Sequence, residues 1–253
     1  MQVEAAEART LTTNQSKQVS KDDILGISKP LPSPDVLSRN RDRLASFMHG
    51  SHDIVTLILN ILNDKLALPK NTLSNLHRRH EVSGDQVRFV KAPPQPADDR
   101  RTALGQYTDF GSVTVLFNRL GGLQVLPPGA DADWVYVRPL PGHAIVNLGD
   151  AMVKFTNGLL RSNIHRVVAP PGAQAEETRY SLVYFARPED RVMLRRLDGS
   201  DLIPAMAEGQ VEEEINSKDW IIRRALGRRV DVAKEIDFEK SAGTEQLSRR
   251  IKA

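Results

Sequence analysis

The residues best suited to chemistry in this chain lie in three short motifs: Tyr107-Thr108-Asp109, Ser162-Asn163-Ile164-His165-Arg166-Val167 and Arg179-Tyr180-Ser181. A carboxylate and an imidazole are ligands of non-haem iron sites, in which two histidines and one carboxylate occupy one face of the metal and leave the other open. The guanidinium of Arg179 is a planar fork that matches a carboxylate and stays charged when buried. The set predicts an iron site that binds a 2-oxo acid, with Tyr107 standing where a second histidine is expected.

Each of these residues, taken alone, is weak evidence for such a site. An aspartate between a loop and a strand, as at Asp109, more often belongs to a turn or a cap. A single histidine such as His165 is more often a core or surface residue. Arg179 alone would be a surface charge, and Ser181 a strand residue. The prediction therefore depends on their order along the chain.

The middle of the chain has the pattern of a β protein that could bring these residues together. Short β-rich segments alternate with turn signals such as Gly121-Gly122, Pro141-Gly142 and Asn157-Gly158. Many short strands with this punctuation predict a sandwich or a jelly roll. The expected strands are Val87–Val90, Val113–Phe117, Leu123–Leu126, Trp134–Val137, Ala144–Asn147, Met152–Lys154, His165–Val168 and Ser181–Phe185.

Helices are expected on both sides of this β region. Apolar residues over 47–66 recur at helical spacing, and Pro69 ends that element. A second short helix is expected over 72–80 and another over 217–226. Residues 1–45 are polar and proline-rich, so we expect a flexible arm there.

The composition limits the classes of function. The chain has 253 residues and a formal net charge of +3. It contains no cysteine, which excludes disulfides and thiolate metal sites. Arg-Arg pairs near the C-terminus are interspersed with acidic residues, a mixture typical of a solvated helical surface. No segment has the pattern of a membrane span or a signal peptide. We therefore expect a cytoplasmic protein that binds neither nucleic acid nor membranes.

A longer succession of motifs resembles one known family. Besides the three motifs above it includes Val87-Arg88-Phe89-Val90, Gly121-Gly122-Leu123-Gln124-Val125 and Asn147-Leu148-Gly149-Asp150. In this order, over residues 45–190, they resemble the Fe(II)- and 2-oxoglutarate-dependent oxygenases of the isopenicillin N synthase-like family.

The resemblance implies a fold, a cofactor set and roles for individual residues. The fold would be mainly β with flanking helices, a double-stranded β-helix or jelly-roll barrel. Asp109 and His165 would bind Fe(II), whereas Arg179 and Ser181 would bind 2-oxoglutarate, the co-substrate used together with O2. Tyr107 would stand at the position of the first histidine ligand. The Asn147–Asp150 turn would be structural, Gly121-Gly122 would be a hairpin turn, and His143 matches no ligand position.

The resemblance also divides the chain into four segments. These are a flexible arm over residues 1–45, supporting helices over 46–82, the dioxygenase core over 83–190 and a helical extension over 191–253. The arm does not resemble the N-terminal module that supports the barrel in related enzymes. Either the chain is a shortened product, or a partner chain supplies that support, so a homo- or hetero-oligomer stays open.

Tyr107 departs from the family pattern, because the family has its first iron-binding histidine there. A phenol with a pKa of about 10 must lose its proton to bind a metal well, and tyrosinate favours ferric iron. The leading prediction is a dioxygenase that hydroxylates, desaturates or cyclises a small organic substrate, in specialised metabolism. The alternatives are a catalytically impaired homologue that binds 2-oxoglutarate or a partner, and a non-redox enzyme on the same barrel.

Overall fold

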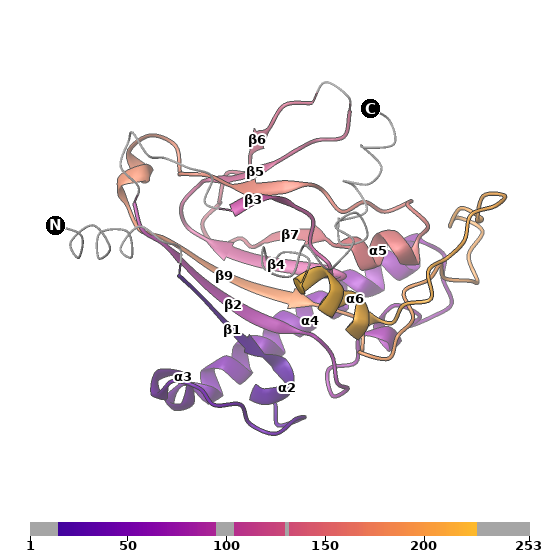
Figure 1. The fold of residues 1–253 in the computed structure, drawn as a ribbon, viewed down its shortest axis with the longest axis horizontal. Helices are drawn as coiled ribbons and strands as arrows, with labels where there is room; N and C mark the ends of the chain where they lie inside the picture. The colour runs from indigo at the N-terminus through magenta and orange to yellow at the C-terminus, as the bar shows by residue number, and fades with distance from the viewer. Residues whose placement is uncertain (1–14, 95–103, 130–131, 227–253) are drawn as a thin grey trace.

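The computed structural model describes residues 15–94, 104–129 and 132–226, and its main feature is a pair of antiparallel β-sheets (Figure 1). The larger sheet has the strand order β1-β2-β9-β4-β7, and the smaller has the order β3-β8-β5-β6. This mainly β architecture with flanking helices agrees with the prediction. The strands are β1 (Gln15–Ser20), β2 (Gln86–Ala92), β3 (Leu104–Tyr107), β4 (Val113–Asn118), β5 (Leu123–Val125), β6 (Val135–Tyr136), β7 (Ile145–Leu148), β8 (His165–Val167) and β9 (Arg179–Ala186).

The larger sheet has two chemically different faces. Successive side chains of a strand point to opposite sides, and the register pairs Val87 of β2 with Tyr184 of β9. Both are completely buried in the hydrophobic core beneath the sheet. Their neighbours Arg88 and Val183, also paired, line a cavity on the other face. One face therefore stabilises the fold, and the other is available for function.

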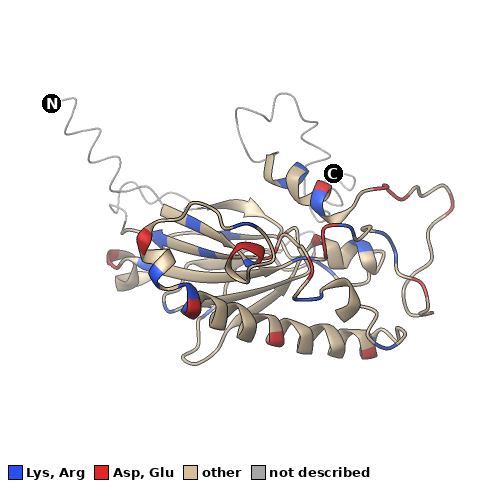
Figure 2. Ribbon diagram, turned by 90° about the horizontal axis from the view of Figure 1, so that it is seen from below, with Lys and Arg blue, Asp and Glu red and all other residues tan. Residues whose placement is uncertain are grey.

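Helix α4 (Arg41–Lys65) runs along the core face of the larger sheet (Figures 1 and 2). Its buried apolar residues recur at helical spacing and so form one stripe. This stripe shares a hydrophobic core with Val87 and Tyr184. The apolar residues of the stripe are Leu44, Met48, Val55 and Leu59.

In the described part of the chain, no helix is both long and apolar enough to cross a membrane.

Residues 15–45, expected to belong to a flexible arm, are ordered elements of the fold. Strand β1 pairs antiparallel with β2 along its whole length. It leads into helix α2 (Lys21–Ile24), where Ser20 caps the first turn, and then α3 (Asp35–Arg39). Single-sequence reasoning missed β1 because its side chains are mostly polar and exposed, and β pairing is decided by the neighbouring strand. Residues 1–14 lie outside the described residues.

Two further predicted elements differ in type or length. The strand expected at Met152–Lys154 is part of helix α5 (Asp150–Phe155), in which Ala151, Met152 and Phe155 are buried together. Over so short an apolar run, helix and strand cannot be distinguished by periodicity. The helix expected over 72–80 is reduced to the 3-10 turn η1 (Ser74–Leu76). A second 3-10 turn, η3 (Gly172–Glu176), precedes β9.

Helix α6 (Ser217–Leu226) has the bounds predicted for it. The side chain of Asn216 accepts a hydrogen bond from the Asp219 backbone N–H at 2.8 Å, which caps the first turn. The indole Nε1 of Trp220 donates to the Phe110 carbonyl at 3.1 Å. The helix is thereby attached directly behind the Tyr107-Thr108-Asp109 motif.

Candidate active site

Asp109 lies in the connection between β3 and β4 and is almost completely buried. Its Oδ2 accepts two hydrogen bonds, from Thr114 Oγ1 and from Asn147 Nδ2, each at 2.7 Å. These bonds fix the orientation of the carboxylate and turn its Oδ1 toward His165, 3.8 Å from the imidazole Nε2. Asn147 therefore positions Asp109 directly, in addition to the structural role in a turn that the sequence suggested.

His165 begins β8, and its ring orientation is set by the backbone just before it. The Nδ1 atom lies 3.1 Å from the carbonyl oxygen of Asn163. Because a carbonyl can only accept, Nδ1 carries the proton of the neutral ring, and Nε2 presents its lone pair toward Asp109. Metal-binding histidines are held in this way, with the outer nitrogen bonded to a carbonyl or carboxylate.

The loop that carries Asp109 rests on the turn before α5. The backbone N–H of Asp150 donates to the Asp109 carbonyl at 2.8 Å, and that of Ala151 donates to the Gly111 carbonyl at 3.1 Å. A Cβ atom at Gly149 would lie 2.3 Å from the Gly111 oxygen and 2.9 Å from the Asp109 oxygen. Only a glycine therefore permits this close approach.

A buried carboxylate behind the loop connects the two motifs. Asp150 is fully buried and accepts hydrogen bonds from Thr108 Oγ1, at 3.0 Å, and from Ser162 Oγ. The guanidinium of Arg224 on α6 lies 3.0 Å from the same carboxylate. Thr108 precedes Asp109, and Ser162 lies shortly before His165. The network thus holds both site residues from behind. The sequence had assigned the Arg223-Arg224 pair to a solvated helical surface, which is wrong for Arg224, because its side chain is buried against Asp150.

Tyr107 lies beside His165 in the structure. The two residues are paired across β3 and β8, and their ring centroids are 4.1 Å apart with planes tilted by 57°. Tyr107 lines the same cavity as Asp109 and His165, and its hydroxyl lies within electrostatic range of Arg88 and Arg179. Over the described residues, no group of three or more His, Cys, Asp or Glu side chains could hold a metal ion.

Arg179 and Ser181 both face this cavity from β9. Arg179 is almost completely buried; its Nε donates to the Gly121 carbonyl at 2.8 Å, and its Nη1 donates to Ser181 Oγ. Burial lowers the pKa of Arg179 from its ordinary value, although an arginine remains charged at neutral pH. The guanidinium is thus fixed in place at the cavity wall with Nη2 not used in these bonds.

The cavity between the two sheets has a volume of about 450 Å³, within the usual range for small-molecule sites. It brings together all five residues that the sequence singled out. A residue whose role the sequence did not reveal, Arg88, also lines it. The sequence did contain a signal, because Arg88 is the one charged residue in the otherwise apolar expected strand Val87–Val90. The apolar wall includes Val90, Leu116, Leu123, Val125, Ile145 and Val183.

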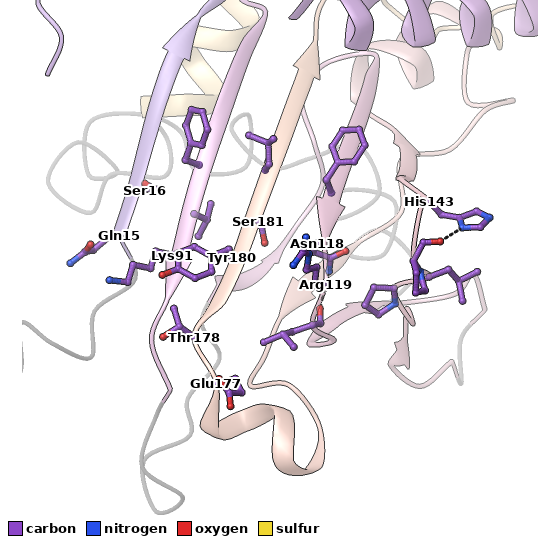
Figure 3. Close-up of a pocket in the computed structure, with 18 of the residues that line it drawn as sticks. Gln15, Ser16, Lys91, Asn118, Arg119, His143, Glu177, Thr178, Tyr180 and Ser181 are labelled. Atoms are coloured by element: carbon purple, nitrogen blue, oxygen red, sulfur yellow. Dashed lines mark hydrogen bonds between the residues drawn. The ribbon is translucent and has the colours of Figure 1, made fainter. Parts of the chain in front are cut away.

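A larger groove of about 1540 Å³ lies around the ends of β1, β2, β9 and β4 and shares Val90 and Ser181 with the smaller cavity (Figure 3). Its walls carry Lys91 and Tyr180, whose strand neighbours face the cavity. His143 also borders this groove, where its Nδ1 lies 2.9 Å from the Pro141 carbonyl. The groove contains neither Asp109 nor His165, so we place the candidate chemistry in the smaller cavity.

The smaller cavity contains two of the three protein ligands expected for a divalent metal, Asp109 and His165. Asp109 Oδ1 and His165 Nε2 lie 3.8 Å apart in the same cavity, and a carboxylate and an imidazole are the residue types that would hold Fe(II). Both atoms point toward each other and both are oriented by outer hydrogen bonds. Where the expected triad has its second histidine stands Tyr107, whose ring lies against that of His165.

Several known proteins are similar in sequence to this chain. A family model described as the 2OG-Fe(II) oxygenase superfamily matches residues 83–188. The chain is 34% identical over 168 residues to the 2-oxoglutarate-dependent dioxygenase iboH of Amanita muscaria, which covers 66% of this chain and 81% of the relative. It is 33% identical over 208 residues to a 2-oxoglutarate-dependent dioxygenase of Aspergillus fumigatus, covering 74% of this chain and 54% of the relative.

The chain spans about half the length of the relatives from Aspergillus fumigatus and Gibberella zeae that it matches, 54% and 53%. Among solved structures, a full-length protein of Neurospora crassa in complex with alpha-KG aligns with a TM-score of 0.71 at 23% identity, covering 83% of this chain and 64% of that chain. A putative 2OG-Fe(II) oxygenase family protein from Caulobacter crescentus aligns with a TM-score of 0.68 at 23% identity, covering 85% and 69%. These likenesses confirm the predicted double-stranded β-helix fold.

Proposed function

We propose a function from the premise that this chain belongs to the 2OG-Fe(II) oxygenase superfamily: it is a 2-oxoglutarate-dependent dioxygenase that oxidises a small organic substrate. Fe(II) is the metal of this family, and 2-oxoglutarate and O2 are its co-substrates. When bound, Fe(II) supplies the oxidative chemistry together with both co-substrates. The observation that carries the proposal is the approach of Asp109 Oδ1 and His165 Nε2 to 3.8 Å in the cavity that also contains Arg179.

Each residue of the chain has a distinct task in this proposal. Asp109 and His165 hold the metal, and their outer hydrogen bonds keep the carboxylate and the imidazole oriented before it binds. Arg179 binds the distal carboxylate of 2-oxoglutarate, because a fixed guanidinium can donate two parallel hydrogen bonds to it. Ser181 assists by holding the guanidinium in place. The apolar wall excludes water from the reacting groups.

The substrate proposed is a small organic molecule of specialised metabolism, which the enzyme hydroxylates, desaturates or cyclises. The relatives named above are fungal 2-oxoglutarate-dependent dioxygenases, and the size of the cavity suits a small ligand. We propose with it the division into supporting helices over 46–82 and a dioxygenase core over 83–190. In the extension expected to be helical over 191–253, α6 is the only helix among the described residues, and 227–253 lie outside them. The absence of nucleic-acid binding and the cytoplasmic location stay predictions.

A second function is favoured by one observation, the position of Tyr107. Its ring lies against the His165 ring where the family has a histidine ligand, which leaves two protein ligands of the usual three. A catalytically impaired homologue would still bind 2-oxoglutarate through Arg179 but would not turn it over. Both functions therefore predict that 2-oxoglutarate binds, but only the dioxygenase converts it.

The test is succinate formation from 2-oxoglutarate under O2, with Fe(II) supplied, together with 2-oxoglutarate binding. A dioxygenase forms succinate in the wild type, and Asp109→Ala combined with His165→Ala abolishes it. Arg179→Gln is expected to weaken 2-oxoglutarate binding by roughly 30-fold or more, since losing one partner of a buried charge pair costs about 2–5 kcal/mol. Binding without succinate supports the impaired homologue. Unchanged binding in Arg179→Gln contradicts both functions.

A further inference from the structure

Arg88 is a cation in the cavity wall to which the proposed function gives no task. It lies on β2 and points into the cavity, since its neighbour Val87 faces the core. Its guanidinium lies over the ring of Phe185 at 5.0 Å, a cation–π contact that holds the head group in place. Phe185 is paired with Thr114, the residue that bonds Asp109. The head group of Arg88 is therefore directed to the Asp109 end of the cavity.

The hydrogen-bonding capacity of Arg88 is largely unused. Its Nε is buried and has no hydrogen-bond partner. Its Nη2 reaches one acceptor, the side-chain oxygen of Gln86 at 3.2 Å, in the amide orientation that satisfies that glutamine. A guanidinium has five N–H donors, and a buried donor left without an acceptor destabilises the protein. A residue in this state is suited to an anion supplied by a ligand.

The charges around the cavity also favour an anionic ligand. Burial lowers the pKa of Arg88, while the nearby Tyr107 and Asp109 act in the opposite direction. Asp109 already accepts hydrogen bonds from Thr114 and Asn147. The lining residues include the arginines 88, 161 and 179 but a single carboxylate, that of Asp109. The charges of Fe(II) and of the 2-oxoglutarate dianion would cancel, so their binding would leave this excess of positive charge unchanged.

Arg88 is far enough from Arg179 to serve a different ligand. Arg88 is paired with Val183, and Arg179 with Ala92, so the two arginines are four residues apart in register. At about 3.4 Å per residue in an antiparallel sheet, their backbones are separated by about 14 Å along the strands. Tyr107 lies within electrostatic range of both. Two arginines thus line one cavity at separate positions along the strands, together with Asp109 and His165.

We propose that the substrate of this cavity is a small carboxylate with an apolar body, and that Arg88 binds its carboxylate while the aliphatic wall contacts the rest. The proposal rests on the proposed function for the place of 2-oxoglutarate at Arg179. It assigns Arg88 a role in substrate selection and not in the chemistry. Arg161 lines the same cavity but is exposed, so water and salt screen its charge.

The test compares binding of octanoate with that of its uncharged isostere octanamide, measured by calorimetry on the full chain in the presence of 2-oxoglutarate. We expect the wild type to prefer the acid by about tenfold or more, equivalent to about 1.4 kcal/mol. Arg88→Gln should bring the preference below twofold, and Arg88→Lys should retain part of it. Arg161→Gln, which removes the same charge from the same cavity, should keep most of the preference. The same comparison of octanoate with octanamide is then made in the Arg179→Gln variant, which lacks the proposed 2-oxoglutarate subsite.

The outcomes separate this inference from the proposed function. The inference is supported if the Arg179→Gln variant prefers octanoate and loses this preference when Arg88→Gln is added. This holds even if 2-oxoglutarate does not bind to the wild type. Equal binding of acid and amide, or no binding of either, overturns it even if 2-oxoglutarate binds and is turned over. A preference lost in Arg161→Gln but kept in Arg88→Gln also overturns it.

Discussion

Removal of Arg224 tests whether α6 supports the site from behind. Arg224 is almost completely buried, and its Nη2 lies 3.0 Å from Asp150 and 3.1 Å from Thr108 Oγ1. Arg224→Met keeps most of the volume beside Phe110 and Trp220 but leaves the carboxylate of Asp150 buried without its cation. Breaking a buried ion pair in this way costs about 3–5 kcal/mol.

The assay is urea unfolding followed by circular dichroism. For an m-value of about 3 kcal/mol per molar urea, the upper end expected for small proteins, a loss of about 3 kcal/mol lowers the midpoint by about 1 M. Arg223→Met is the matched control, because Arg223 pairs with the partly exposed Glu213. Partly exposed pairs contribute at most about 1 kcal/mol, so its midpoint should move little.

A double-mutant cycle shows whether the loss comes from this pair. Asp150→Asn removes the buried charge, so Arg224→Met should cost less in that background, with a coupling free energy of at least about 1 kcal/mol. Two single losses that add to within about 0.5 kcal/mol would refute the buried pair. Equal midpoints for Arg224→Met and Arg223→Met would refute the docking of α6.

Three further changes have predicted outcomes. Thr114→Val removes one donor to Asp109 and should weaken metal binding about 10–100-fold, measured by metal titration; an unchanged affinity would separate Thr114 from the site. Gly149→Ala places a methyl group against backbone oxygens and should cost more than about 1 kcal/mol of stability in urea unfolding, whereas Gly105→Ala, which meets no atom within 4 Å, should cost little. Burial lowers the pKa of His77, so the folded protein keeps it neutral while the unfolded chain takes up a proton below about pH 6.5. The contribution of His77 to stability should therefore be constant above that pH and fall on acidification by up to about 1.4 kcal/mol per pH unit. His77→Gln should show a shallower fall, and parallel curves would contradict this cause.

The sequence predicted the parts of the molecule in which local pattern and order agree. The alternation and turn signals around β4, β5, β7, β8 and β9 located the strands, and the motifs identified residues that the structure brings into one cavity. It missed β1, because the polar residues Gln15–Ser20 form a strand only against β2. It also mistook α5, since its buried side is defined by packing and not by its short apolar run.

Contacts between segments far apart in the sequence could not be predicted, because they form only when the whole chain folds. Arg224 and Asp150 meet only after α6 docks on the loop behind Asp109. The charge of Arg88 could be read from the sequence, but its unused donors could not, because they depend on what surrounds the guanidinium. The missing histidine at Tyr107 was visible at once, whereas the contact of its ring with His165 required the structure.

The most direct test of the account is an anaerobic Fe(II) titration in the presence of 2-oxoglutarate, followed by the visible metal-to-ligand charge-transfer band. We predict a band in the wild type, tighter Fe(II) binding in Tyr107→His, which adds the third ligand, and no band when Asp109→Ala and His165→Ala are combined. A band only in Tyr107→His would instead support the impaired homologue. A band that survives the loss of Asp109 and His165, or its absence from both the wild type and Tyr107→His, would contradict the proposed site.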